Sequence, residues 1–185
     1  KGKLSHRARD TGEVVLQDCL VPKDAILPNS GGLKSPLMCL TQARYGIVWG
    51  ALGAALACFD EALQYALQRE MFGKPIAATQ LQQERLAEMA TKVTNGQLLA
   101  LQLGRLKDQG IMTPVQVSLA KRHNVDMACD VAREARRLLG ANGILGGWHA
   151  MRHMANLESV YTYEGTHDMH TLIVGQELTG FPAYR

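Results

Sequence analysis

The sequence is poor in aromatic side chains and carries little net charge. Aromatic residues make up 5% of the 185 positions, and 20 Lys and Arg against 17 Asp and Glu leave a net charge of +3. Surfaces that bind single-stranded nucleic acid need stacked aromatic rings and clustered cations. No block of five or more basic residues occurs, so the composition gives no support for a nucleic-acid partner.

Cysteine and long hydrophobic runs are also scarce. The four cysteines, Cys19, Cys39, Cys58 and Cys129, form no CxxC pair, and three of them lie among apolar residues. This pattern favours buried free thiols in a reducing compartment over a disulfide framework. No run of about 18 apolar residues is free of charge, so we expect no membrane span, and we recognise no signal peptide.

The common catalytic and metal-binding motifs are missing. His149 and His153, and then His167 and His170, have helical spacing, but there is no HExxH and spacing fixes no third ligand; we therefore expect no metal site and read these histidines as surface or core residues. No GxSxG motif and no cysteine in an activating context indicate nucleophilic catalysis. "GANGILGG" follows a predicted helix, so it is no Rossmann motif, although a loop that brings backbone close to a ligand stays open.

The first 34 residues differ from the rest. "TGEVVLQDCLVP" is rich in β-formers, and we predict short strands around 3–6 and 13–20, followed by a linker, "PNSGGLKSP". Two such strands cannot form a stable sheet alone. Because the chain also begins at Lys1 rather than Met, we expect it to be part of a longer protein, with 1–34 as the end of a β domain.

From Ser35 onward the apolar residues follow a helical period. Ser35 and Pro36 predict the start of a long helix that ends near Glu70, and its small-residue stretch "WGALGAALA" indicates either close helix packing or a flat ligand. Thr79-x-x-Gln82 and Thr113-Pro114-x-Gln116 predict capping boxes for helices that end near Gly110 and Gly140. Shorter helices are predicted around 148–160 and 166–178. The predicted fold is mainly α, an antiparallel bundle over 35–185.

The most informative break is "YEGTHD". Thr166 is a predicted N-cap, so the positive end of the last helix faces the loop, and Glu164 lies two residues earlier beside a glycine. A carboxylate placed in this way can act as a base towards a weak carbon acid, although a plain capping turn explains the residues equally well. In "REMFGKP", Arg69 either offsets the dipole of its helix or joins Phe72 in a site for a phosphate and a flat ring.

Taken together, "REMFGKP", "LGANG" and "YEGT", in this order on a bundle that follows a β segment, resemble the acyl-CoA dehydrogenase family. Within it, "ARYGIVWGALGA", "VSLAKRHN" and "NLESVYTYEGTHDMH" are similar to the branch that acts on glutaryl-CoA. The resemblance covers essentially the whole chain. It implies FAD as cofactor, a homotetramer, and a chain comprising the last strands of a middle β domain and a C-terminal four-helix-bundle domain.

The resemblance also implies residue roles. Glu164 would be the catalytic base that removes the α-proton of the acyl-CoA thioester while the β-hydrogen leaves as hydride to FAD. In the glutaryl branch CO2 is then lost, and the protonated Glu164 returns its proton to give crotonyl-CoA. The electrons would pass to electron-transfer flavoprotein.

Further residues are implied for the cofactor and the substrate. The implied FAD contacts are Arg69, Phe72, Gln80, Gly140, Asn142, Gly143, Thr166 and Asp168, the first two usually in the site of a neighbouring subunit. The implied substrate contacts are Arg44, Tyr163 and Gly165. In the glycine loop, Arg137 stands where many relatives carry Gln, and Ala141 stands where they carry Gly. The contact that this Gln makes to FAD in relatives is therefore not expected here.

Two alternatives stay open at this stage. The enzyme could act on another acyl-CoA, because residues that grip a distal carboxylate are expected in a domain upstream of Lys1. The chain by itself could also be a helical oligomerisation module without activity. The expected location is the cytoplasm for a bacterial protein and the mitochondrial matrix for a eukaryotic one.

Overall fold

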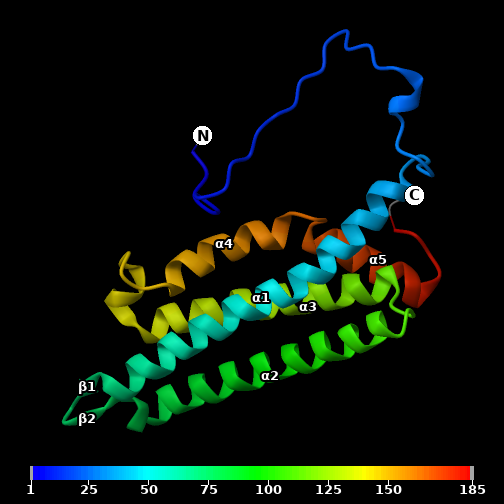
Figure 1. Cartoon of the computed structure of the whole chain (residues 1–185). Coiled ribbons are helices and arrows are strands. Elements are labelled where there is room, and N and C mark those ends of the chain that lie inside the picture. Colours follow the sequence, from blue (N-terminus) through cyan, green and yellow to red (C-terminus); the bar gives the residue numbers. More distant parts are fainter. Residues whose placement is uncertain (1, 184–185) are drawn as a thin grey trace.

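The computed structural model describes residues 2–183 and is mainly helical (Figure 1). The α-helices are α1 (Lys34–Gln68), α2 (Gln80–Asp108), α3 (Pro114–Leu138), α4 (Ala150–Thr162) and α5 (His167–Thr179). The short elements are η1 (Lys23–Ala25), β1 (Glu70–Met71), β2 (Lys74–Pro75), η2 (Ile76–Ala78) and η3 (Gly140–Ile144). The predicted helical bundle is confirmed.

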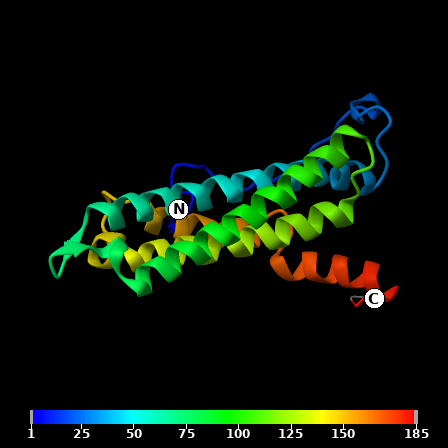
Figure 2. The ribbon, with the colours of Figure 1, turned by 90° about the horizontal axis from the view of Figure 1, so that it is seen from below.

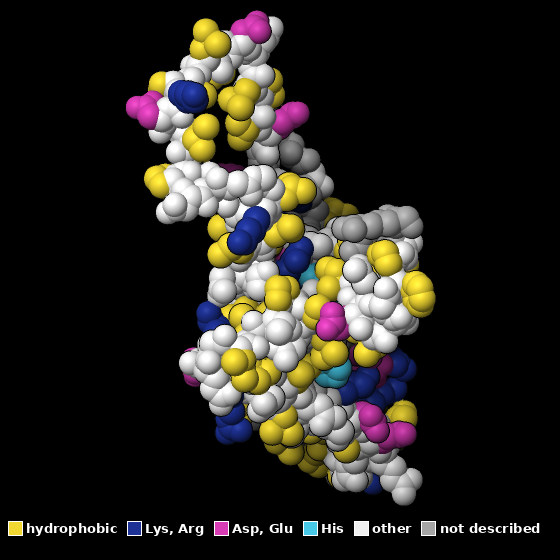
Figure 3. All heavy atoms as spheres, turned by 90° about the vertical axis from the view of Figure 1, so that its right-hand side faces the viewer, with side chains coloured by type: hydrophobic (Ala, Val, Ile, Leu, Met, Phe, Trp, Pro, Cys, Tyr) yellow, Lys and Arg dark blue, Asp and Glu magenta, His cyan; other side chains and the backbone are white. Residues whose placement is uncertain are grey.

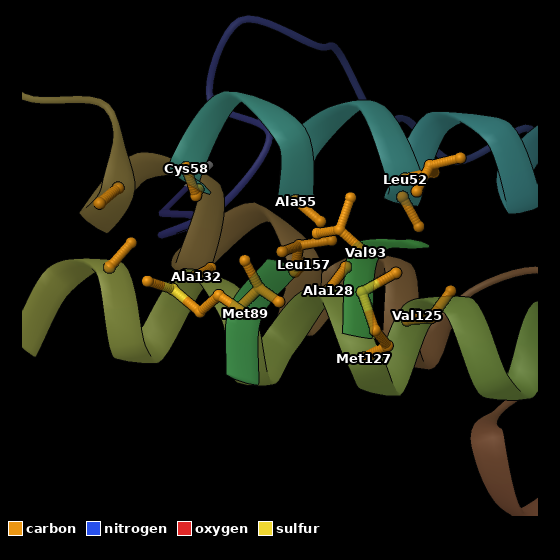
Figure 4. Close-up of a cluster of buried hydrophobic side chains, with 14 of the residues drawn as sticks. Leu52, Ala55, Cys58, Met89, Val93, Val125, Met127, Ala128, Ala132 and Leu157 are labelled. Carbon is orange, nitrogen blue, oxygen red and sulfur yellow. The ribbon is translucent and has the colours of Figure 1, made fainter. Parts of the chain in front are cut away.

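Helix α3 lies at the centre of the bundle and packs against each of the other four α-helices. Helices α1, α2 and α3 run side by side, α4 lies along α3, and α5 lies at one end (Figures 1 and 2). The core between them is rich in small side chains, among them Ala55 of α1 and Ala128 and Ala132 of α3, with Leu157 of α4 closing it (Figure 4). The small residues of α1 thus allow the close helix packing that the sequence predicted.

A buried amide ties three helices together. Asn124 of α3 donates from Nδ2 to the carbonyl of Val48 in α1 at 3.3 Å and to that of Gly96 in α2 at 3.1 Å. A Cβ on Gly96 would lie 2.7 Å from the terminal methyl of Met127 and 3.2 Å from Asn124 Oδ1, so a larger residue would displace these side chains where α2 approaches α3. A buried polar side chain needs such partners, and the ones it finds fix the positions of the three helices.

The helix starts agree with the sequence only in part. At α3 the capping box is confirmed, since the Thr113 hydroxyl accepts from the Gln116 N–H and the Gln116 side chain accepts from the Thr113 N–H. The predicted box at Thr79 is wrong, because its hydroxyl donates instead to the carbonyl of Ile76 at 2.7 Å, the nearer partner in the preceding turn.

The N-cap predicted at Ser35 is also wrong. Helix α1 begins at Lys34 with Leu33 as its N-cap, and the Leu37 N–H bonds to the Leu33 carbonyl. Ser35 and Pro36 therefore lie inside the first turn. Pro36 is tolerated there because the first backbone N–H groups of a helix have no partner within it.

Beyond α1 the chain makes a hairpin that the sequence analysis did not predict. Phe72 and Gly73 join β1 to β2 with φ angles of 55° and 75°. Two successive left-handed residues are the geometry of a tight two-residue hairpin turn. The helix predicted to continue to Glu70 therefore ends at Gln68.

The strands predicted around 3–6 and 13–20 are wrong for this structure. Residues 2–33 follow an irregular path apart from η1, and Val14, Val15 and Leu16 are exposed. Figure 3 shows this segment projecting from the bundle with hydrophobic side chains on its surface. A strand needs neighbours to pair its backbone groups, and within residues 2–183 only β1 and β2 pair with each other.

All four cysteines are free thiols, as predicted. Cys58 is buried and Cys129 partly buried, but Cys19 and Cys39 are exposed, so burial is wrong for these two. Cys19 lies on the irregular segment and Cys39 near the start of α1, outside the core. By length and composition alone, α1 could cross a membrane, a test that the core helix of a bundle also passes.

Candidate active site

The loop between α4 and α5 holds Glu164 in an unusual backbone conformation. Glu164 has φ 58° and Gly165 has φ 91°. For a residue with a Cβ the left-handed conformation costs about 1–2 kcal/mol, so neighbouring contacts must compensate.

Those contacts come from three side chains on three helices, which we call the loop clamp: Arg44 of α1, Lys121 of α3 and His170 of α5. Lys121 Nζ donates to the carbonyl oxygens on either side of Glu164, at 2.6 Å to Tyr163 and 2.7 Å to Gly165. Arg44 Nε donates to the carbonyl of Glu164 itself at 2.7 Å, and His170 Nε2 lies 3.3 Å from the same oxygen. Three consecutive carbonyls are thereby held.

Burial sets the charge state within the clamp. Lys121 is 1% exposed, and its burial, followed by the nearby Arg44 charge, lowers its pKa to about 8, while Glu164 acts in the opposite direction. Burial, Lys121 and Arg44 together lower the pKa of His170 to about 4. His170 is therefore neutral at pH 7, and because a carbonyl only accepts, its proton resides on Nε2.

The clamp leaves no room for a side chain at the next position. A Cβ on Gly165 would lie 3.1 Å from His170 Nε2 and 3.2 Å from a terminal guanidinium nitrogen of Arg44. Together with its positive φ, this close approach accounts for glycine after Glu164.

The Glu164 carboxylate itself remains available. Its Oε2 atom is buried and has no hydrogen-bond partner among the described residues. Thr166 caps α5 as predicted, accepting from the Met169 N–H at 3.2 Å. The positive end of α5 thus begins beside a carboxylate whose main chain is tied and whose buried oxygen is free for a ligand.

An apolar cavity of about 440 Å³ adjoins this loop. Gly46 and Gly50 of α1 form one wall, Leu157 and Val160 of α4 form another, and Tyr163, the residue before Glu164, also lines it. The size and lining suit a short acyl chain rather than a polar ligand. The small residues of α1 therefore serve a cavity as well as the packing against α3.

A second group of predicted residues lies at the opposite end of the bundle, near the β1–β2 hairpin (Figure 1). Arg69, Gly140 and Asn142 line a cavity of about 400 Å³, and Asn142 Nδ2 donates to the Tyr65 hydroxyl at 3.2 Å. Phe72 at the hairpin tip is 94% exposed. The structure brings these residues together and keeps them apart from Glu164.

The glycine loop of this second group is tightly built. Gly140 has φ 59°, and a Cβ on Gly143 would lie 2.3 Å from the carbonyl oxygen of Arg136. Gln80 is exposed at the start of α2, and its neighbour Gln82 lines the cavity instead. Arg137, which replaces the Gln of many relatives, pairs with Glu134 at 2.5 Å.

Sequence reasoning missed two members of the clamp and placed the third differently. Lys121 stands on the buried stripe of α3 with Val117 and Asn124, and a charge on such a stripe is a signal that could have found it. His170 fits the core reading, being fully buried. Arg44, predicted as a substrate contact, donates a hydrogen bond from Nε to the Glu164 carbonyl. Its role towards a substrate stays a prediction. Within residues 2–183, no cluster of three or more metal-ligating side chains occurs.

Comparison with known proteins places the chain in a family. Residues 30–179 match the family model described as "Acyl-CoA dehydrogenase, C-terminal domain". A match over most of the chain shows membership, so the chain belongs to the acyl-CoA dehydrogenase family, and the predicted resemblance is confirmed.

Individual relatives add detail. The human mitochondrial short-chain specific acyl-CoA dehydrogenase is 32% identical over 177 residues, which is 95% of this chain and 43% of that protein. A glutaryl-CoA dehydrogenase structure from Mycobacterium smegmatis superposes with a TM-score of 0.87 at 55% identity, over 89% of this chain and 43% of that one. The chain thus spans less than half the length of these relatives.

A flavin is established for the family by a second structure. A glutaryl-CoA dehydrogenase from Mycobacterium smegmatis in complex with FADH2 has 49% identity and a TM-score of 0.84, over 85% of this chain and 41% of that one. The predicted flavin cofactor is confirmed for this family. The residues present here fit such a group, because the Arg69 guanidinium and the Gly140 backbone line one cavity, and the exposed ring of Phe72 lies three residues after Arg69 at the hairpin tip.

Proposed function

We propose that the protein containing this chain is an FAD-dependent acyl-CoA dehydrogenase with Glu164 as its base. The observation that carries the proposal is the buried, unpartnered Oε2 of Glu164 on a loop whose carbonyls are held by the clamp. A base that must remove the weakly acidic α-proton of a thioester needs a fixed position and exclusion of water. The apolar cavity beside Tyr163 supplies a dry place for the acyl chain.

The bound flavin would supply the acceptor for the β-hydrogen, which leaves as hydride. Arg69 and Phe72 would hold it from the hairpin end, with Gly140, Asn142 and Gly143 offering the backbone of their loop and Gln80 at the start of α2. Thr166 and Asp168 would contact it at the first turn of α5. Because the two groups lie at opposite ends of one bundle, they would serve two different flavins in an assembly of several copies.

The proposed substrate is glutaryl-CoA. Sequence similarity supports this substrate, since a glutaryl-CoA dehydrogenase structure is 55% identical to this chain while the human short-chain relative is 32% identical. The product would be crotonyl-CoA after loss of CO2, with Glu164 returning its proton, and the electrons would pass to electron-transfer flavoprotein. Turnover of glutaryl-CoA against butyryl-CoA by the full-length enzyme separates this branch from a short-chain dehydrogenase.

Replacement of the base tests the activity directly. Glu164→Gln in the full-length enzyme removes the proton acceptor but keeps the size of the side chain, so we expect dehydrogenation to fall at least about a thousandfold while flavin stays bound. Reduction of the flavin by acyl-CoA is followed by its absorbance. Glu158→Gln, on the exposed side of α4, is the matched control and should retain activity. Undiminished activity in Glu164→Gln contradicts the assignment.

A further inference from the structure

The buried cation Lys121 has a role that the sequence motifs do not assign. It is 1% exposed, lies on α3 and makes no ion pair among the described residues. Its hydrogen bonds go to the carbonyls of Tyr163 and Gly165, the two residues that flank Glu164. Burying an ammonium group costs free energy. The two short charge-assisted hydrogen bonds that Lys121 donates to this loop offset that cost.

The loop needs that stabilisation because its backbone is strained. Glu164 and Gly165 have successive positive φ angles, and nothing in the Glu164 side chain compensates, since its Oε2 has no partner among residues 2–183. Without Lys121, two partly buried carbonyls would lose this donor, and the chain on both sides of Glu164 would be less firmly held. The free carboxylate and the tied main chain belong to one arrangement.

We propose that Lys121 is a positioning residue that fixes the orientation of the Glu164 carboxylate by holding the carbonyls on either side of it, with Arg44 and His170 completing the hold. The proposal rests on Glu164 being the base. Lys121 acts through the main chain, by donating to the two carbonyls that flank Glu164. The other groups that face it are the guanidinium of Arg44 on α1, the neutral imidazole of His170 on α5 and Glu164 itself.

The test uses the full-length flavin-loaded enzyme carrying Lys121→Met, which keeps an unbranched side chain but removes donors and charge. Because a misplaced base slows chemistry more than binding, we expect kcat to fall about tenfold to a hundredfold with KM changed less than about twofold. Lys92→Met on α2, which removes a surface ion pair with Asp130 of α3, is the control and should change neither kcat nor KM.

Two further variants keep the outcome decisive. Lys121→Arg keeps the charge and the donors and should recover part of kcat, whereas His170→Asn removes one contact to the Glu164 carbonyl and should give a smaller fall in kcat at unchanged KM. If the parent enzyme is active and Lys121→Met leaves kcat unchanged, the positioning role is wrong while the proposed function stands. If no Lys121 variant binds flavin, unchanged kcat in His170→Asn likewise counts against it. An inactive parent enzyme overturns the proposed function, and this inference with it.

Discussion

At the scale of single residues, the site depends on two side chains, Lys121 and His170, whose burial disfavours their protonated, charged forms. Lys121 and His170 are buried side by side with the partly buried Arg44 around one loop, and both have lowered pKa values for this reason. A solvated histidine or lysine would be of little use here, since water would compete for the carbonyls. Burial makes each donated bond count for more.

His170 makes the stability of the bundle depend on acid. Its pKa is about 4 in the folded chain against an ordinary 6.5, so between these values the unfolded chain binds more protons. The free energy of unfolding should therefore be fully supported above pH 6.5 and lose about 3 kcal/mol from this group as pH falls to 4.

Urea unfolding of the parent chain and of His170→Asn between pH 4 and pH 7 measures this contribution. The variant should show a shallower loss of stability towards acid, because it has no imidazole to protonate. His123→Asn, at an exposed position on α3, serves as the control. Parallel pH curves for the parent and His170→Asn would show that His170 is not the group responsible.

At the scale of elements, the most informative contact joins α1 to the start of α4. Helix α4 has no cap from its own N-cap side chain. The Glu61 carboxylate of α1 accepts instead from the N–H groups of His149, at 2.8 and 3.0 Å, and of Ala150, at 2.9 Å. A carboxylate at this end both caps the helix and complements its dipole.

Glu61→Gln should consequently destabilise the chain by about 1–2 kcal/mol. The amide keeps one oxygen acceptor but loses the charge and the second acceptor. The midpoint of urea unfolding at pH 7 reports the change, and Glu177→Gln on the exposed side of α5 should leave the midpoint nearly unaltered. An unchanged midpoint in Glu61→Gln would mean that α4 is held by its packing on α3 and not by this cap.

At the scale of the whole molecule, the two groups of candidate residues face different directions. The loop that holds Glu164 lies between α4 and α5. Arg69 and the 94% exposed Phe72 lie at the β1–β2 hairpin, at the far end of the bundle (Figure 1). Large hydrophobic side chains are also exposed on two helices, Trp49 on α1 and Leu98 and Leu101 on α2. Exposed hydrophobic side chains of this kind are typical of surfaces that contact another domain or subunit, and the homotetramer stays a prediction.

The isolated chain of residues 1–185 should for this reason bind FAD weakly or not at all. In the proposed arrangement each end of the bundle carries only part of a flavin site, and a partial site loses most of the contacts that give the binding free energy. The absorbance spectrum of the purified chain after incubation with FAD and desalting is the measurement. A stoichiometric yellow protein would show that the bundle alone completes the site.

The sequence by itself determined the helices and most of their ends, and it led to the prediction that Glu164 is the base. Helical periodicity, the Thr113 and Thr166 caps and the glycines at 110, 140 and 180 are local signals, so they could be read without the fold. The N-cap predicted at Ser35 was wrong because α1 already begins at Lys34, and the capping box predicted at Thr79 was wrong because its hydroxyl bonds to the preceding turn. The β1–β2 hairpin was missed because its Phe72–Gly73 turn carries little sequence signal.

Only the tertiary structure decided how the loop of Glu164 is held. Arg44, Lys121 and His170 are separated along the chain by whole helices, and no spacing rule links them to the carbonyls at 163–165. Packing of α1, α3 and α5 at one end of the bundle brings them together and removes the water that would weaken their bonds. Tertiary context also explains residues 2–33. Their β-forming sequence stays irregular because a strand is stable only when another strand pairs with it.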